Sequence, residues 1–153
     1  MTRHILLDSS PLGILSNPSE SSEGIAITKW SRELLAAGHR LYLPEIIDYE
    51  LRRELLRAGK MKSVAKLNGL RAALRFLPVT TAVMLHAAEL WAIARKNGFS
   101  TGDPKKLDID VILSAQALSL SVPATDLIVA TANVRHISQF VAADEWSNIH
   151  PKG

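Results

Sequence analysis

Three carboxylates able to bind a hard cation stand in distant parts of this sequence. Asp8 directly follows a short apolar run, Glu50 lies in PEIIDYELRREL, and Asp110 lies in KLDIDVILSAQAL. Carboxylates that a fold brings together repel one another, so they must take up protons or hold a cation. Magnesium or manganese is the usual cation, and it commonly activates a water for phosphodiester hydrolysis. The open question is whether the fold gathers these acids.

Each acidic residue also has an ordinary explanation. Asp8 is a good helix cap, and Glu50 borders an apolar stripe without needing to lie in a site. Asp108 and Asp110 both precede an apolar helix, where capping and the helix dipole account for one acid in the first turn. The second acid of this pair is then left over for a site, and either residue fits that description.

The segment VATANVRHI carries two further polar groups at the end of an apolar run. Asn133 is typical of a turn, and Thr131 places a hydroxyl at the end of a strand. Neither residue indicates a site by itself. Both follow a strand, where a parallel sheet would place them near Asp8.

The elements that must position these groups alternate along the chain. Short apolar runs predict strands, and longer segments with helical spacing predict helices. The expected strands cover residues 4–7, 40–43, 77–79 and 127–131, with an edge strand at 146–149. The expected helices cover residues 25–37, 45–58, 64–75, 81–96, 108–120 and 134–141. Residues 16–23 are expected to form a polar loop or lid, and residues 99–106 a second loop.

This alternation predicts an α/β fold: a three-layer sandwich with a short, mainly parallel central sheet flanked by helices. Ligand sites in such folds lie beyond the carboxyl ends of the strands. Asp8 and Asn133 follow strands, and Asp110 stands at the start of a predicted helix. The fold class is therefore compatible with one acidic site at one edge of the sheet.

Composition sets broad limits. The 153 residues are expected to form a single domain over 1–153, and the absence of cysteine excludes disulfides and thiolate chemistry. No apolar run is long enough to cross a bilayer and no signal peptide is recognisable, so a cytoplasmic location is expected. The net charge is only +3, although Lys and Arg side chains cluster between residues 52 and 66. A basic rim of that kind would suit a polyanionic substrate, and a solvated helix face is the alternative.

Four motifs, taken in order, give the chain a resemblance to a known family. ILLDSSPLGILSNP, LPEIIDYELRREL, DIDVILSAQAL and VATANVRHI together resemble a PIN-domain ribonuclease of the VapC toxin type, over essentially the whole chain. The resemblance implies metal ligands at Asp8, Glu50 and Asp110, with Asp108 as a possible substitute for Asp110. The fourth catalytic position falls on Asn133, where many relatives have Asp, and a later acidic position falls on His136. Thr131 and Ser9 would support the acids.

The same resemblance implies an activity and partners. It implies an endoribonuclease that uses Mg²⁺ or Mn²⁺, inhibits translation, and is neutralised by a VapB-like antitoxin. It also implies a homodimer. Arg52, Arg53 and Arg135 are the candidate contacts to RNA phosphates.

Three other functions compete with this one, and the residues argue against two of them. A receiver domain needs paired acids after the first strand and a Lys after the last, whereas this chain has Asp8-Ser9-Ser10 and its last core strand ends in ATANVRH, without a Lys. A haloacid-type phosphatase needs Asp at position 10, where Ser10 stands. A catalytically weak or inactive RNA-binding or partner-binding module stays open, because Asn133 adds no charge.

Overall fold

A computed structural model describes residues 1–98 and 104–151. Its strands form one parallel sheet in the order β3-β2-β1-β4-β5. The strands are β1 (His4–Leu7), β2 (Arg40–Pro44), β3 (Arg75–Leu77), β4 (Leu127–Ala130) and β5 (Ala143–Asp144). The predicted parallel α/β sheet is therefore confirmed.

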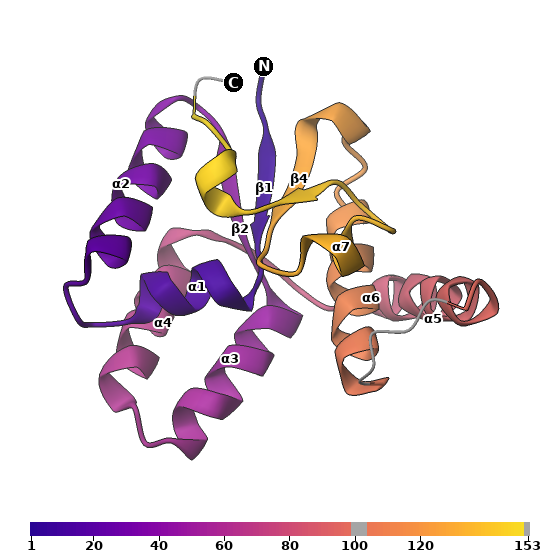
Figure 1. Ribbon diagram of the computed structural model, residues 1–153, viewed down its shortest axis with the longest axis horizontal. Coiled ribbons are helices and arrows are strands. Elements are labelled where there is room, and N and C mark those ends of the chain that lie inside the picture. The colour runs from indigo at the N-terminus through magenta and orange to yellow at the C-terminus, as the bar shows by residue number, and fades with distance from the viewer. Residues whose placement is uncertain (99–103, 152–153) are drawn as a thin grey trace.

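Helices pack on both sides of these strands, as Figure 1 shows. They are α1 (Ser9–Ser16), α2 (Ser22–Ala36), α3 (Glu45–Arg57), α4 (Met61–Ala73), α5 (Thr81–Lys96), α6 (Pro104–Leu118) and α7 (Val134–Ile137). Because helices cover both faces, a central strand must be apolar throughout. Ile5, Leu6 and Leu7 of β1 are each fully buried. The three-layer arrangement is the predicted one.

The largest departure from the sequence-based expectation is α1, a helix that was not predicted and that overlaps the expected loop only at Ser16. Asp8 caps this helix by accepting a hydrogen bond from the Ser9 backbone N–H at 2.7 Å. Pro11 lies in the first turn, where its missing N–H is not needed, and Leu12 and Leu15 are buried. Only residues 17–21 remain outside helices, because Ser21 caps α2 at Gly24. The prediction of a loop or lid over 16–23 was therefore too broad.

Helix α6 begins four residues earlier than predicted. Pro104 is its first residue, and proline is favoured at that position. Asp108 and Asp110 consequently lie inside the helix, beyond its first turn. Capping therefore explains neither of them. Of the loop expected at 99–106, residues 99–103 lie outside the described part of the chain.

The remaining differences concern short elements. Strand β3 ends at Leu77, before Pro78, because proline offers no N–H for the ladder. The predicted edge strand at 146–149 is wrong: the edge strand is Ala143–Asp144, and Trp146–Asn148 form a 3₁₀ turn. Helix α7 ends at Ile137 and does not extend to residue 141. These shifts leave the ends of β1 and β4 where the site needs them.

Candidate active site

A small cavity of about 230 Å³ lies beyond the carboxyl ends of β1 and β4. Asp8, Glu50, Asp110 and Asn133 all line it, although they come from four separate segments. Strand β1 pairs in parallel with β4, with Leu7 beside Ala130, so the residues that follow each strand emerge side by side. Helices α3 and α6 contact each other and bring in the other two acids. The fold therefore gathers the residues singled out in the sequence.

Asp8 is held rigidly at the centre of this site. Its backbone N–H donates to the Ala130 carbonyl at 2.9 Å, which continues the β1–β4 ladder. One carboxylate oxygen accepts from the Ser9 N–H at 2.7 Å, and the other accepts from the Thr131 hydroxyl at 2.7 Å. Capping and site membership are thus compatible, because the cap uses only one of the two oxygens.

Thr131 links the acid to the neighbouring strand. Its side chain is buried, its backbone N–H donates to the Asp144 carbonyl at 3.0 Å, and its hydroxyl accepts from the Asn133 N–H at 2.8 Å. The hydroxyl can therefore direct its only proton to Asp8. This arrangement fixes both the Asp8 carboxylate and the turn that carries Asn133.

Glu50 faces the cavity from the middle of α3. Burial raises the pKa of its carboxyl, and the negative charge of Asp8 raises it further. A hydrogen bond with the Ser9 side chain and the positive charges of Lys106 and Arg53 act in the opposite direction. Glu50 is therefore a carboxyl group that the site can hold in its protonated form more readily than an exposed glutamate.

Asp110 carries the clearest electrostatic anomaly. It is 4% exposed, and its Oδ2 atom is buried without a hydrogen-bond partner. Burial, followed by the charge of Asp8, raises the pKa of Asp110 to about 7. A buried carboxylate oxygen normally has a partner, and the absence of one points to a proton or a cation. Asp108, in contrast, is exposed and does not line the cavity.

Asn133 lines the cavity at the start of α7. Its side-chain oxygen is engaged by the Nδ1 atom of His136, one turn along the same helix. The two positions at which the sequence departs from the family pattern are therefore joined to each other. An amide in this position offers an uncharged oxygen, which adds no further repulsion to the three acids.

Lys106 is a cavity residue that the sequence reasoning missed. It lies on α6, four residues before Asp110, and its positive charge lowers the pKa of both Asp110 and Glu50. Among the described lining residues it is the only cationic one. The spacing of four residues could have revealed it, since side chains at that spacing share a helix face.

The three arginines predicted to contact phosphates occupy different environments, and none lines the cavity. Arg52 forms an ion pair with the buried Asp48 at 2.7 Å and donates to Asn68 at 2.6 Å. Arg53 stacks over the ring of Tyr49 and is near enough to influence the pKa of Glu50. Arg135 is exposed on α7. Arg53 is thus the arginine that the electrostatics connect with the site.

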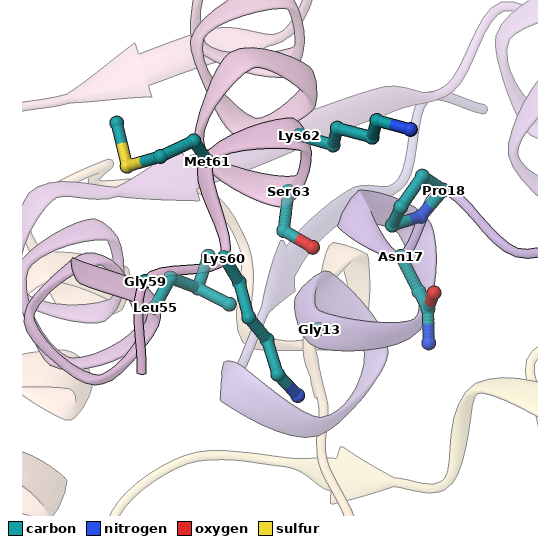
Figure 2. Close-up of a pocket in the computed structure, with 9 residues that line it drawn as sticks. All are labelled: Gly13, Asn17, Pro18, Leu55, Gly59, Lys60, Met61, Lys62 and Ser63. Atoms are coloured by element: carbon teal, nitrogen blue, oxygen red, sulfur yellow. The ribbon is translucent and has the colours of Figure 1, made fainter. Parts of the chain in front are cut away.

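A larger cavity lies away from the acids. Figure 2 shows this cavity, of about 580 Å³, between the end of α1 and the connection from α3 to α4. Lys60 and Lys62 line it, and no carboxylate does. Part of the basic cluster seen in the sequence therefore lies at a separate surface. Volume alone therefore does not single out the acidic cavity, because the carboxylates line the smaller of the two.

The donor set of the acidic cavity fits a hard divalent cation. Asp8, Glu50 and Asp110 offer carboxylate oxygens, and the buried Oδ2 atom of Asp110 lacks a partner. Within the described ranges, no three acidic or histidine side chains lie close enough together to form a complete metal site. Burial, followed by the charge of Asp8, raises the pKa of Asp110, and a cation bound between these carboxylates would relieve both costs.

The sequence was compared with models of known protein families and with curated proteins. The model of the PIN domain matches residues 5–145. Comparison with curated proteins gives no significant match. No helix in the described part of the chain is long and apolar enough to span a membrane.

Solved structures with a similar fold include three VapBC complexes. VapBC2 from Rickettsia felis, bound to a promoter DNA fragment, gives a TM-score of 0.70 at 15% identity and covers 94% of this chain and 98% of that chain. VapBC-1 from nontypeable Haemophilus influenzae gives a TM-score of 0.65 at 18% identity and covers 95% of this chain and 99% of that chain. DNA-bound VapBC from Salmonella typhimurium gives a TM-score of 0.61 at 18% identity, with the same shares of the two chains covered, 95% and 99%. At these identities the likeness concerns the fold. The family match covers most of the chain, and we conclude that this protein belongs to the PIN-domain family, as its motifs predicted.

Proposed function

We propose that residues 1–153 act as a single metal-dependent endoribonuclease domain in the cytoplasm. PIN domains are generally nucleases, and the chain carries their acidic residues around one cavity. The observation that carries the proposal is the buried, unpartnered Oδ2 atom of Asp110 beside Asp8. A carboxylate in that situation is stabilised by a cation, which a nuclease needs for catalysis.

Asp8 and Asp110, with Glu50, would hold Mg²⁺ or Mn²⁺. The ion would supply a water of lowered pKa and charge stabilisation for the leaving oxygen. Thr131 and the Ser9 N–H keep Asp8 oriented, and the raised pKa of Glu50 allows this residue to hold or release a proton beside the substrate. Lys106 would neutralise an RNA phosphate at the cavity mouth.

We further propose that the protein is the toxin of a VapBC-type pair and inhibits translation. The similarity of its fold to chains of VapBC complexes supports a VapB-like antitoxin as partner. As the assembly we propose a homodimer. A small neighbouring reading frame that encodes a DNA-binding protein would support the pair. Co-expression should then relieve growth arrest and yield a complex of the two chains.

A second candidate is an RNA-binding or partner-binding module with weak or no activity. Asn133 favours it, because the amide supplies no charge at the fourth position. Under this alternative the protein binds RNA without cleaving it. Restoring the family residue with Asn133→Asp should then create or strongly increase cleavage.

The decisive experiment follows cleavage of single-stranded RNA by the purified chain with Mg²⁺, with Mn²⁺ or with EDTA. We expect cleavage with either metal, none with EDTA, and losses of at least about a hundredfold in Asp8→Asn and Asp110→Asn. Asp108→Asn is the matched control on the same helix and should keep most of the activity. Cleavage in EDTA, or cleavage that survives both substitutions, would exclude the proposed mechanism.

A further inference from the structure

A second cavity, of about 410 Å³, adjoins the acidic one. The two cavities share Ser10, Thr131 and Ala132 as lining residues. Its volume falls within the range of about 300–1,000 Å³ that is usual for small-molecule sites. If a polymeric ligand places one of its phosphates beside Asp8, the group next to that phosphate would therefore reach this cavity.

One wall of this cavity is aromatic and fixed in place. Trp146 lines it, and this indole also packs in a T-shaped arrangement against the buried Trp30, at 5.6 Å between ring centroids. Trp30 is itself anchored by its indole N–H, which donates to the Ile149 carbonyl at 2.7 Å. The Trp146 ring is therefore a preformed surface on which a flat group can stack.

The turn that carries Trp146 is tied to the acidic site through Thr131. The Asp144 carbonyl accepts from the Thr131 N–H at 3.0 Å, while the Thr131 hydroxyl donates to Asp8 at 2.7 Å. The Asp144 side chain in turn accepts from the Glu145 N–H at 2.8 Å and from the Asn148 amide at 3.0 Å. Short hydrogen bonds thus fix the position of the aromatic wall relative to the first acid.

The polar lining of the cavity accepts hydrogen bonds and repels anions. Glu23 and Glu145 supply carboxylates, and Ser10 and Ser147 supply hydroxyls. Two carboxylates disfavour a phosphate in this place, whereas they accept N–H donors from a neutral ring. The occupant indicated by this chemistry is a flat, uncharged group that carries N–H donors.

We propose that this cavity is a nucleobase subsite, which holds the unpaired base next to the scissile phosphate. It stacks the base on Trp146 and reads its Watson–Crick edge with Glu145 and Glu23. Guanine offers adjacent N–H donors on that edge and should bind best, whereas uracil offers mainly acceptors and should bind worst. This inference rests on the proposed action on RNA and adds a base preference to it.

Nucleoside binding to the full chain in EDTA tests the subsite without requiring cleavage. Guanosine and uridine are titrated while the indole N–H resonances of the three tryptophans are followed by NMR, with Trp146→Phe and Trp91→Phe used for assignment. Guanosine should shift the Trp146 resonance, leave the resonance of the exposed Trp91 unchanged, and bind at least about fivefold more tightly than uridine.

Two variants separate recognition from folding. Glu145→Gln changes an exposed side chain and should reduce the preference for guanosine over uridine, while Glu89→Gln on α5 should leave it unchanged. Trp146→Leu should abolish nucleoside binding. Equal binding of the two nucleosides, or an unchanged preference in Glu145→Gln, would overturn the subsite.

The outcome is distinguishable from that of the cleavage experiment. If guanosine binds at Trp146 but RNA is never cleaved, the subsite stands and the nuclease activity fails. If RNA is cleaved with equal rates next to every base and no nucleoside shifts Trp146, the nuclease activity stands and the subsite fails.

Discussion

At the scale of single residues, Asp110 joins electrostatics to stability. In the metal-free protein the pKa of this carboxyl is about 7, against an ordinary value of 3.8. The unfolded chain therefore releases the proton at lower pH than the folded chain does. Between these two values the folded state binds more protons, so stability falls as the pH rises. The site thus destabilises the protein at neutral pH when no cation is present.

Asp110→Asn should therefore stabilise the metal-free protein at high pH. Each unit of pKa shift corresponds to about 1.4 kcal/mol, so the gain at pH 8 should be one to a few kcal/mol and should vanish near pH 4. Urea unfolding in EDTA at pH 4, 6 and 8 measures it. Asp108→Asn, at an exposed position on the same helix, should show no gain at any pH. An equal gain at pH 4 and pH 8 would contradict the electrostatic explanation.

A second prediction at this scale concerns Lys106, whose positively charged side chain lines the cavity together with the acids. Removing its charge should strengthen divalent-cation binding and weaken RNA binding, since the first interaction is repulsive and the second attractive. Lys106→Met should therefore lower the dissociation constant for Mn²⁺ severalfold and raise KM for RNA by about tenfold. Calorimetry and cleavage kinetics measure the two effects.

Lys105→Met is the matched control for this prediction, because Lys105 is an exposed neighbour outside the cavity lining. It should change both constants far less than Lys106→Met does. Changes of the same sign in metal and RNA binding would show that Lys106 acts through the fold of α6.

At the scale of elements, the site depends on how α3 is held against α6. Gln116 on α6 is fully buried; its amide nitrogen donates to the Leu77 carbonyl at 2.6 Å, and its oxygen accepts from the Ile46 N–H at 3.3 Å. Glu45, the first residue of α3, connects this helix to the segment after β3, because its carboxylate accepts from the Val79 N–H at 2.7 Å. These bonds use backbone groups that strand and helix ends leave without partners. They fix the start of the helix that carries Glu50.

Gln116→Leu should destabilise the protein by about 1–3 kcal/mol, because the part-buried Leu77 carbonyl and Ile46 N–H lose their partner. Chemical denaturation measures the loss. Gln139→Leu is the matched control, since Gln139 is exposed on the surface, and should change stability by less than about 0.5 kcal/mol. Equal losses in the two variants would show that the bridge contributes nothing specific.

The elements also show where reasoning from sequence succeeds. β1 and α3 were predicted because their apolar patterns are strong and their ends are marked by Asp8 and Pro44. α1 was not predicted, and the first turn of α6 was placed in a loop, although proline, here Pro11 and Pro104, is well accommodated in a first helical turn.

Some residues of the candidate site were likewise predicted from the sequence, and others were missed. The carboxylates were found because acids beside apolar runs stand out by type. Lys106 was missed because one lysine in a basic chain is ordinary until the fold places it in the cavity. The position of Trp146 beside Thr131 depends on the pairing of β4 with β5. This pairing joins only two residues of each strand, and no local sequence pattern predicts it. Long-range pairing is the part of the site that sequence alone does not reveal.

At the scale of the whole molecule, α5 carries large apolar side chains that the monomer leaves exposed. Figure 1 shows it at the outer edge of the fold, beside α6, which it contacts through Val83, Ala87 and Ala94. Large apolar side chains nevertheless lie on its outward side: Leu85 is 65% exposed and Ile93 is 55% exposed. Large apolar side chains that gather on an exposed surface are typical of an interaction site. A second copy of the chain is the partner proposed to cover it.

Leu85 lies on the side of α5 opposite Val83, because two residues advance an α-helix by roughly 200°. A charge there would leave the fold of the monomer intact and oppose burial in a dimer, since an isolated buried carboxylate is strongly disfavoured. Leu85→Glu should therefore convert a dimer into a monomer in size-exclusion chromatography with light scattering. Leu35→Glu, at a 48% exposed position on α2, should leave the dimer unchanged. If the unmodified chain is monomeric at high concentration, or if Leu85→Glu remains dimeric, the apolar face of α5 is not the interface between two copies.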